Sequence, residues 1–272
     1  MNYSNGPIGL FDSGVGGLTI ARAIARRLPK ESILYFGDTA HLPYGEKSPD
    51  AIKTFSLKIC EHLIKNGAKA IVIACNSASS VAFEYLEERI NVPVFNVIDP
   101  LIDELQKLKP KGIGVWGTHA TINSKVYNHK LEKSLPGTPV NSLATPLLVP
   151  LIEENHLNGE ITDSIIQYYL QESKISNLDH LVLACTHYPL IASQISKHLD
   201  MRVSLLRTPT IVADWIAIEL DNLGLLNKEQ NTINHSFSVS DYTETFKKIS
   251  RIFFGDGIIL KEQNIWKSTD SI

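Results

Sequence analysis

Short apolar runs alternate with longer segments of helical periodicity along the first part of the chain. Four of the runs have the length of buried strands. They lie at 8–13, 33–38, 70–75 and 92–98. The segments between them have the i, i+3, i+4 spacing of helices and lie at 17–28, 49–66 and 78–90. Strands that alternate with helices in this way predict a parallel sheet covered by helices.

The same alternation begins again after residue 99, without a flexible linker rich in Gly, Pro or Ser. Further strands are predicted at 112–118, 139–145, 180–186 and 203–208, with helices over 121–133 and 160–172. The last part of the chain predicts a helix over 209–223, a strand over 235–240 and a helix over 242–250. The fold expected from this pattern is α/β, with two similar lobes, each a mostly parallel sheet flanked by helices.

Composition excludes several classes of protein. The chain has 272 residues, a formal net charge of −3 and no broad excess of basic residues, so we expect no nucleic-acid partner. No apolar run reaches about 18 residues, so we expect no membrane span. The first residues lack the features of a secretory signal, and the three cysteines are an odd number. We therefore expect a cytoplasmic protein with free thiols.

Polar and nucleophilic side chains follow several predicted strands directly. In open α/β sheets, ligands bind outside the carboxyl ends of the strands. The residues at those ends are Asp12, Ser13, Asp38, Cys75, Asn76, Ser77, Thr118, Cys185, Thr186 and His187. Two lobes that face each other would place one thiol on each side of a cleft, and this cleft is the expected active site.

The repeated position of the thiols is the most specific of these signals. Cys75 and Cys185 each follow an apolar run and precede a helix-like segment, where the helix dipole favours a thiolate. Any single cysteine is more often a buried structural residue, and Cys60 inside a predicted helix fits that interpretation. His187, two residues after Cys185, could hold or relay a proton for it.

Two cofactor hypotheses are weaker. Cys75, Cys185 and His187 could be metal ligands, but the sequence lacks the C-x-x-C or H-x-x-x-H spacing of a zinc site, so we expect no metal. The glycine-rich stretch 12–19 has Thr19 at the third position of the dinucleotide fingerprint. It predicts a tight turn that could still present N–H groups to a carboxylate.

Taken together, six segments resemble the glutamate racemases, cofactor-independent enzymes of bacterial cell-wall synthesis. They are GLFDSGVGGLT, YFGDTAHLPYGEKS, IVIACNSAS, GVWGTHATINSKVY, PLLVPLIEE and LVLACTHYPLI, and they spread over residues 8–191 in the order of the family. The resemblance implies interconversion of L- and D-glutamate without a cofactor, with a homodimer as a possible assembly. It also implies a discontinuous first lobe, 1–98 plus 210–263, and a second lobe, 99–209.

The resemblance assigns roles to individual positions. Cys75 and Cys185 match the catalytic thiols, and Asp12 and His187 match their acid/base helpers. The implied substrate-binding residues are Asp12, Ser13, Tyr44, Gly45, Asn76, Ser77, Thr118, Thr121, Glu153, Thr186 and His187. Ser77 stands where the family usually has Thr and keeps the hydroxyl, and the match after residue 200 is weak.

Two alternatives remain beside this assignment. A related two-thiol racemase or isomerase for another small acid would need the same thiols with different binding groups. A two-lobed amino-acid-binding module with inert thiols would bind its ligand without exchanging the α-hydrogen. A panel of amino acids in deuterated water separates the three.

Overall fold

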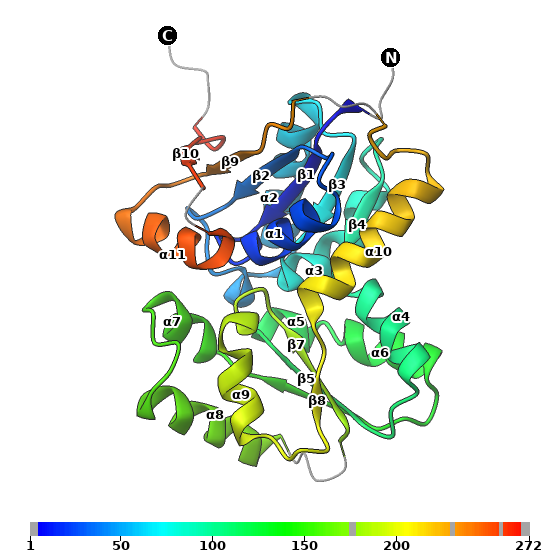
Figure 1. Cartoon of the computed structure of the whole chain (residues 1–272), viewed down its shortest axis with the longest axis vertical. Coiled ribbons are helices and arrows are strands. Elements are labelled where there is room, and N and C mark those ends of the chain that lie inside the picture. Colours follow the sequence, from blue (N-terminus) through cyan, green and yellow to red (C-terminus); the bar gives the residue numbers. More distant parts are fainter. Residues whose placement is uncertain (1–4, 174–177, 229–231, 256–257, 268–272) are drawn as a thin grey trace.

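The residues described by the computed structural model form ten strands in two parallel sheets, one in each of two lobes (Figure 1). The structure describes residues 5–173, 178–228, 232–255 and 258–267. The first sheet has the order β10-β9-β2-β1-β3-β4, with β1 Ile8–Asp12, β2 Ile33–Gly37, β3 Ala70–Ile73, β4 Val94–Asn96, β9 Ser236–Val239 and β10 Leu260–Glu262. The second has the order β6-β5-β7-β8, with β5 Ile113–Gly117, β6 Val140–Ala144, β7 His180–Ala184 and β8 Ser204–Leu205.

Helices cover both faces of each sheet, which is why the central strands are buried at every position and mostly apolar. Around the first sheet, one face is covered by α1 Leu18–Arg27, α10 Thr208–Asn222 and α11 Glu244–Phe254, and the other by α2 Pro49–Lys65 and α3 Asn76–Glu87. Around the second, α4 Asp99–Leu108 and α6 Val126–Ser134 cover one face, and α8 Glu160–Glu172 and α9 Ala192–His198 the other. Figure 1 shows α10 leading from β8 back to the first lobe.

The predicted fold class is confirmed, and most predicted strands and helices form close to their expected bounds. Two local predictions were wrong, and some elements were not predicted. The helix expected over 121–133 is two helices, α5 His119–Asn123 and α6, because Lys125 between them has a left-handed φ of 57°. Helices α4 and α7 Leu148–Glu153 were not predicted, and the strand expected over 203–208 is the two-residue β8.

The chain crosses between lobes twice, at α4 and at α10. The side chains of Ile98, Leu101 and Leu105 pack with Ile113 and Val182 of the second sheet, so α4 belongs to the second core. Strands β9 and β10 extend the first sheet beyond β2. The carboxyl ends of β1 and β3 and those of β5 and β7 face each other across the gap between the lobes. Within the described residues, no helix is both long and apolar enough to span a membrane.

Candidate active site

A small cavity lies where the carboxyl ends of the two sheets face each other. The lining residues come from both lobes and are Ser13, Gly14, Leu42, Pro43, Tyr44, Gly45, Cys75, Asn76, Ser77, Thr118, Val149, Glu153, Cys185, Thr186 and His187. Its volume is about 30 Å³, which is room for a water molecule or two. Both strand-end thiols therefore meet in one enclosed space, as the sequence predicted.

Cys75 is the N-cap of α3 and is held from two sides. Its Sγ accepts a hydrogen bond from the backbone N–H of Ala78 at 3.5 Å, and the thiol donates to Ser13 Oγ at 3.7 Å. Burial and, secondarily, the nearby Asp12 carboxylate raise the pKa of Cys75 to about 12, although the hydrogen bonds oppose this shift. Cys75 is thus a protonated thiol at neutral pH, ready to give a proton.

Cys185 lies at the end of a row of three interacting side chains. Its Sγ is 3.8 Å from His187 Nδ1, and His187 Nε2 is 3.0 Å from Glu153 Oε1. Burial alone would lower the pKa of His187, but its hydrogen bonds with Cys185 and Glu153 outweigh burial and raise it to about 10. His187 is therefore an imidazolium at neutral pH, beside the thiol that it can assist.

Asp12 lies behind the cavity rather than on its wall. Its carboxylate accepts hydrogen bonds from the Gly14 N–H at 3.0 Å and from Thr186 Oγ1 of the other lobe at 3.3 Å. Full burial raises the pKa of Asp12, while His187 and these donors act in the opposite direction. Asp12 is thus a shielded carboxyl group that contacts both lobes.

The residues expected to bind substrate present polar groups to the cavity. Tyr127 OH donates to Asn76 Oδ1 at 2.8 Å, which orients the Asn76 amide and leaves its buried Nδ2 without a partner among the described residues. Ser77 and Thr118 share a hydrogen bond of 2.8 Å across the lobes. Thr121 does not line the cavity but accepts from Thr118 Oγ1 at 3.2 Å, which holds that side chain in place.

The glycine-rich turn after β1 serves a close approach between the lobes. A Cβ on Gly16 would lie 2.5 Å from Thr186 Oγ1 and 2.6 Å from His187 Nδ1. Any side chain here would push the two lobes apart. This close approach explains the glycine-rich stretch 12–19, which from the sequence alone could also have presented N–H groups to a carboxylate.

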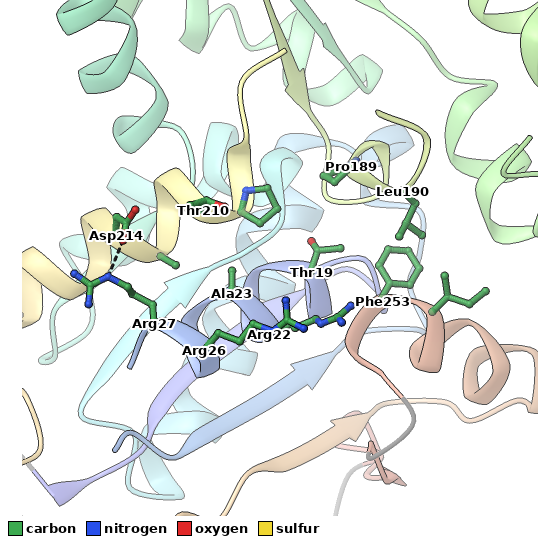
Figure 2. A pocket seen from close by; sticks show the side chains of 13 residues that line it. Thr19, Arg22, Ala23, Arg26, Arg27, Pro189, Leu190, Thr210, Asp214 and Phe253 are labelled. Atoms are coloured by element: carbon green, nitrogen blue, oxygen red, sulfur yellow. Dashed lines mark hydrogen bonds and ion pairs between the residues drawn. The ribbon is translucent and has the colours of Figure 1, made fainter. Parts of the chain in front are cut away.

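A larger pocket lies behind the loop that carries Thr186 and His187, and Figure 2 shows it between α1, α10 and α11. The Phe253 ring packs at right angles to His187, with centroids 5.4 Å apart. Thr19 Oγ1 can donate to the Thr186 carbonyl at 3.3 Å. These residues support the loop from behind, and the pocket contains neither thiol.

Sequence reasoning missed several residues of the site. Gly14, Leu42 and Val149 line the cavity, and Tyr127 orients Asn76. Leu42 adjoins the predicted Tyr44–Gly45 loop, and Gly14 adjoins Ser13, so both could have been found by position. Val149 and Tyr127 carry no local signal, because an apolar residue and a tyrosine within helices are typical of a core. The described residues contain no group of three or more His, Cys, Asp or Glu side chains arranged to hold a metal.

Comparisons with a family model, with known sequences and with solved structures all find racemases. The model of the Asp/Glu/Hydantoin racemase family matches residues 17–214. Glutamate racemase from Neisseria meningitidis is 40% identical over 251 residues, 92% of this chain and 93% of the relative. Glutamate racemase from Aquifex pyrophilus is 50% identical over 193 residues, 71% of this chain and 75% of the relative. The crystal structure of glutamate racemase from Francisella tularensis in complex with D-glutamate superposes with a TM-score of 0.90 at 35% identity, covering 97% of this chain and 99% of that one.

Proposed function

The chain belongs to the glutamate racemases of the Asp/Glu/hydantoin racemase family, and from this we propose that it interconverts L- and D-glutamate by proton transfer between two cysteines, Cys75 and Cys185. The observation that carries the mechanism is the meeting of these two thiols in one closed cavity, each supplied by a different lobe. We further propose that the enzyme is cytoplasmic, supplies D-glutamate for bacterial peptidoglycan and can form a homodimer.

Inversion of a stereocentre needs a base on one face of the α-carbon and an acid on the other. Two thiols on opposite lobes supply both faces at once, provided that one starts as a thiolate and the other as a thiol. Cys75 is the protonated partner, while Cys185 has an imidazolium beside it. After one turnover the two thiols have exchanged protonation states, so the product site is ready for the reverse reaction.

The main barrier is the acidity gap between the α-carbon and a thiol, since each pKa unit of that gap costs about 1.36 kcal/mol. Hydrogen-bond donors to the substrate carboxylate reduce this gap by stabilising the carbanionic intermediate. Asn76 Nδ2 is such a donor, and the hydroxyls of Ser77, Thr118 and Thr186 line the same cavity. The enclosure also keeps water from the intermediate. The scheme requires no cofactor and no metal.

The cavity in this structure is too small for glutamate. The substrate therefore enters only when the lobes separate, which breaks the Ser77–Thr118, Asn76–Tyr127 and Asp12–Thr186 hydrogen bonds. Closure then reforms polar contacts around the substrate and brings the two thiols to opposite faces of its α-carbon.

Purified protein is expected to racemise both enantiomers of glutamate without added cofactor, at a rate unchanged by EDTA. The measurement follows optical rotation from each enantiomer, together with α-hydrogen exchange in deuterated water over a panel of amino acids. Faster exchange of another acid would identify a related racemase, and binding without exchange would identify a binding module. Loss of activity on chelation with recovery on metal addition would refute the metal-free scheme.

Removing the charge of Glu153 is expected to narrow the pH range over which His187 stays protonated. A histidine whose pKa rises on folding stabilises the protein fully below its unfolded value of about 6.5, and this stabilisation is lost as pH rises through about 10. Glu153→Gln should therefore move the alkaline limb of kcat/KM to lower pH and flatten the decline in unfolding free energy between pH 7 and 10. Glu154→Gln, a change at the exposed neighbour, is the matched control. An unchanged alkaline limb in Glu153→Gln would show that the carboxylate does not support the imidazolium.

A further inference from the structure

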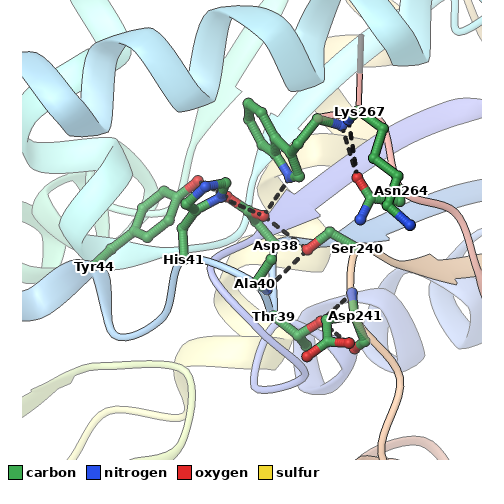
Figure 3. A network of polar contacts seen from close by, with 10 residues as sticks. Asp38, Thr39, Ala40, His41, Tyr44, Ser240, Asp241, Asn264 and Lys267 are labelled. Carbon is green, nitrogen blue, oxygen red and sulfur yellow. Dashed lines mark hydrogen bonds and ion pairs between the residues drawn. The ribbon is translucent and has the colours of Figure 1, made fainter. Parts of the chain in front are cut away.

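Asp38 is a fully buried carboxylate at the end of β2, outside the cavity. Figure 3 shows it between His41, Tyr44 and Ser240. Its oxygens accept hydrogen bonds from Tyr44 OH at 2.7 Å, Ser240 Oγ at 2.8 Å and the Trp266 indole N–H at 2.9 Å, and they lie 2.9 Å from His41 Nδ1. A buried carboxylate depends on such donors, because each one that is lost leaves charge without compensation.

Trp266 comes from the far end of the chain, 228 residues after Asp38. Strand β10 pairs with β9, the Gln263 N–H donates to the Val239 carbonyl at 2.8 Å, and the chain then crosses the loop that follows β2. The indole lies edge-on to His41 at 4.5 Å between centroids and to Phe55 at 5.5 Å. Trp266 is thus packed against the loop as well as hydrogen-bonded to Asp38.

The loop held in this way carries Tyr44 and Gly45, which line the cavity. Tyr44 is buried and its hydroxyl donates to Asp38, so the position of Asp38 determines the position of the ring. Gly45 approaches the second lobe so closely that a Cβ on it would lie 2.7 Å from Thr118 Cβ. A small displacement of this loop therefore changes both the cavity wall and the contact between the lobes.

We propose that residues 258–267 act as a positioning element for the substrate-binding loop, with the Trp266 indole N–H holding Asp38 and, through it, Tyr44 and Gly45. This inference rests on the proposed function, because it assigns to Trp266 an effect on glutamate binding. Trp266 does not touch the cavity and is a positioning residue rather than a catalytic one.

Trp266→Phe tests the hydrogen bond, because phenylalanine keeps an aromatic ring against His41 and Phe55 but has no N–H. We expect KM for glutamate to rise roughly tenfold, as for loss of one hydrogen bond to a charged group, with kcat within about twofold of the parent. The matched control is Trp215→Phe, which removes an indole hydrogen bond of 2.8 Å to Asp103 away from the cavity and should leave KM unchanged. Truncation provides a second test. A chain that ends after Gln263 should show a rise in KM at least as large as that of Trp266→Phe. A chain that ends after Lys267 should have the KM of the full chain.

Hydrogen exchange provides a readout that does not depend on turnover. Exchange of residues 39–47 should rise in Trp266→Phe, with little change in the strands of either sheet. An unchanged KM in a variant that still racemises glutamate would overturn the positioning role and leave the proposed function intact. A lower kcat at constant KM would also overturn it, since that result indicates only less folded enzyme. If the parent protein does not racemise glutamate, the proposed function fails, and exchange in the loop alone then decides whether Trp266 positions it.

Discussion

Replacing either Cys75 or Cys185 by serine is expected to abolish most racemisation in both directions. In the proposed scheme each thiol acts as the base for one enantiomer and as the acid for the other, so neither direction can proceed without both. A serine hydroxyl in place of the thiol is a far weaker acid and base, and loss of a proton-transfer group typically costs about 10²- to 10⁴-fold in rate. The measurement is the initial rate from L- and from D-glutamate for each variant.

Cys60 provides the control, since it is also buried but lies inside α2, away from the cavity. Burial raises the pKa of Cys60 well above its ordinary value, and unlike Cys75 this thiol does not reach the cavity. Cys60→Ser should keep a rate close to that of the parent and lose some thermal stability, because the new hydroxyl is buried. An inactive Cys60→Ser beside an active Cys75→Ser would show that the thiols have been assigned wrongly.

The positions of the thiols could be predicted from the sequence because a parallel sheet brings the carboxyl ends of its strands to one edge. Cys75 follows β3 and Cys185 follows β7, so local apolar runs were sufficient to place both. Ser13 and Asn76 were found by the same reasoning. The resemblance to a family then supplied residues such as Tyr44 and Glu153, whose own sequence context is weak.

Contacts between distant segments could not be predicted in this way. Glu153 lies on the short helix α7, and nothing near it in sequence indicates a partner at His187. The pairing of β9 with β2 joins segments separated by about two hundred residues, and a two-residue strand such as β8 has too short a pattern to define its bounds. Helix α4 starts at Asp99-Pro100, with two residues between it and the end of β4 at Asn96, and from the sequence this dipeptide was interpreted as the boundary between the lobes.

A second large effect on the proton-transfer rates is expected from His187 and Asp12, the acid/base helpers of the two thiols. The family resemblance predicts that Cys185 with His187 takes the α-proton from L-glutamate, and that Cys75 with Asp12 takes it from D-glutamate. The geometry supports a division of roles, since His187 is in contact with Cys185, and the Asp12 carboxylate affects the pKa of Cys75. Asp12 also accepts a hydrogen bond from Thr186, the neighbour of Cys185, so we expect some coupling between the two thiol–helper pairs.

His187→Asn is expected to slow α-proton removal more from L-glutamate, and Asp12→Asn more from D-glutamate, by about 10²- to 10⁴-fold in the affected step. His198→Asn is the matched control, because His198 pairs with Asp163 at 2.9 Å on the outer helices and takes no part in the cavity. It should leave both steps unchanged.

The difference between proton removal from L-glutamate and from D-glutamate in each variant must be measured by primary deuterium isotope effects or single-turnover rates. Because the enantiomers of glutamate have equal free energy, the equilibrium constant stays at one in every variant, and kcat/KM has to fall equally in both directions. Loss of a helper that serves one thiol makes the proton transfer at that thiol more strongly rate-limiting, so the isotope effect rises for the enantiomer deprotonated there and not for the other. A rise on the same enantiomer in both variants would mean that His187 and Asp12 act on one transfer together, and the scheme of one helper for each thiol would fail.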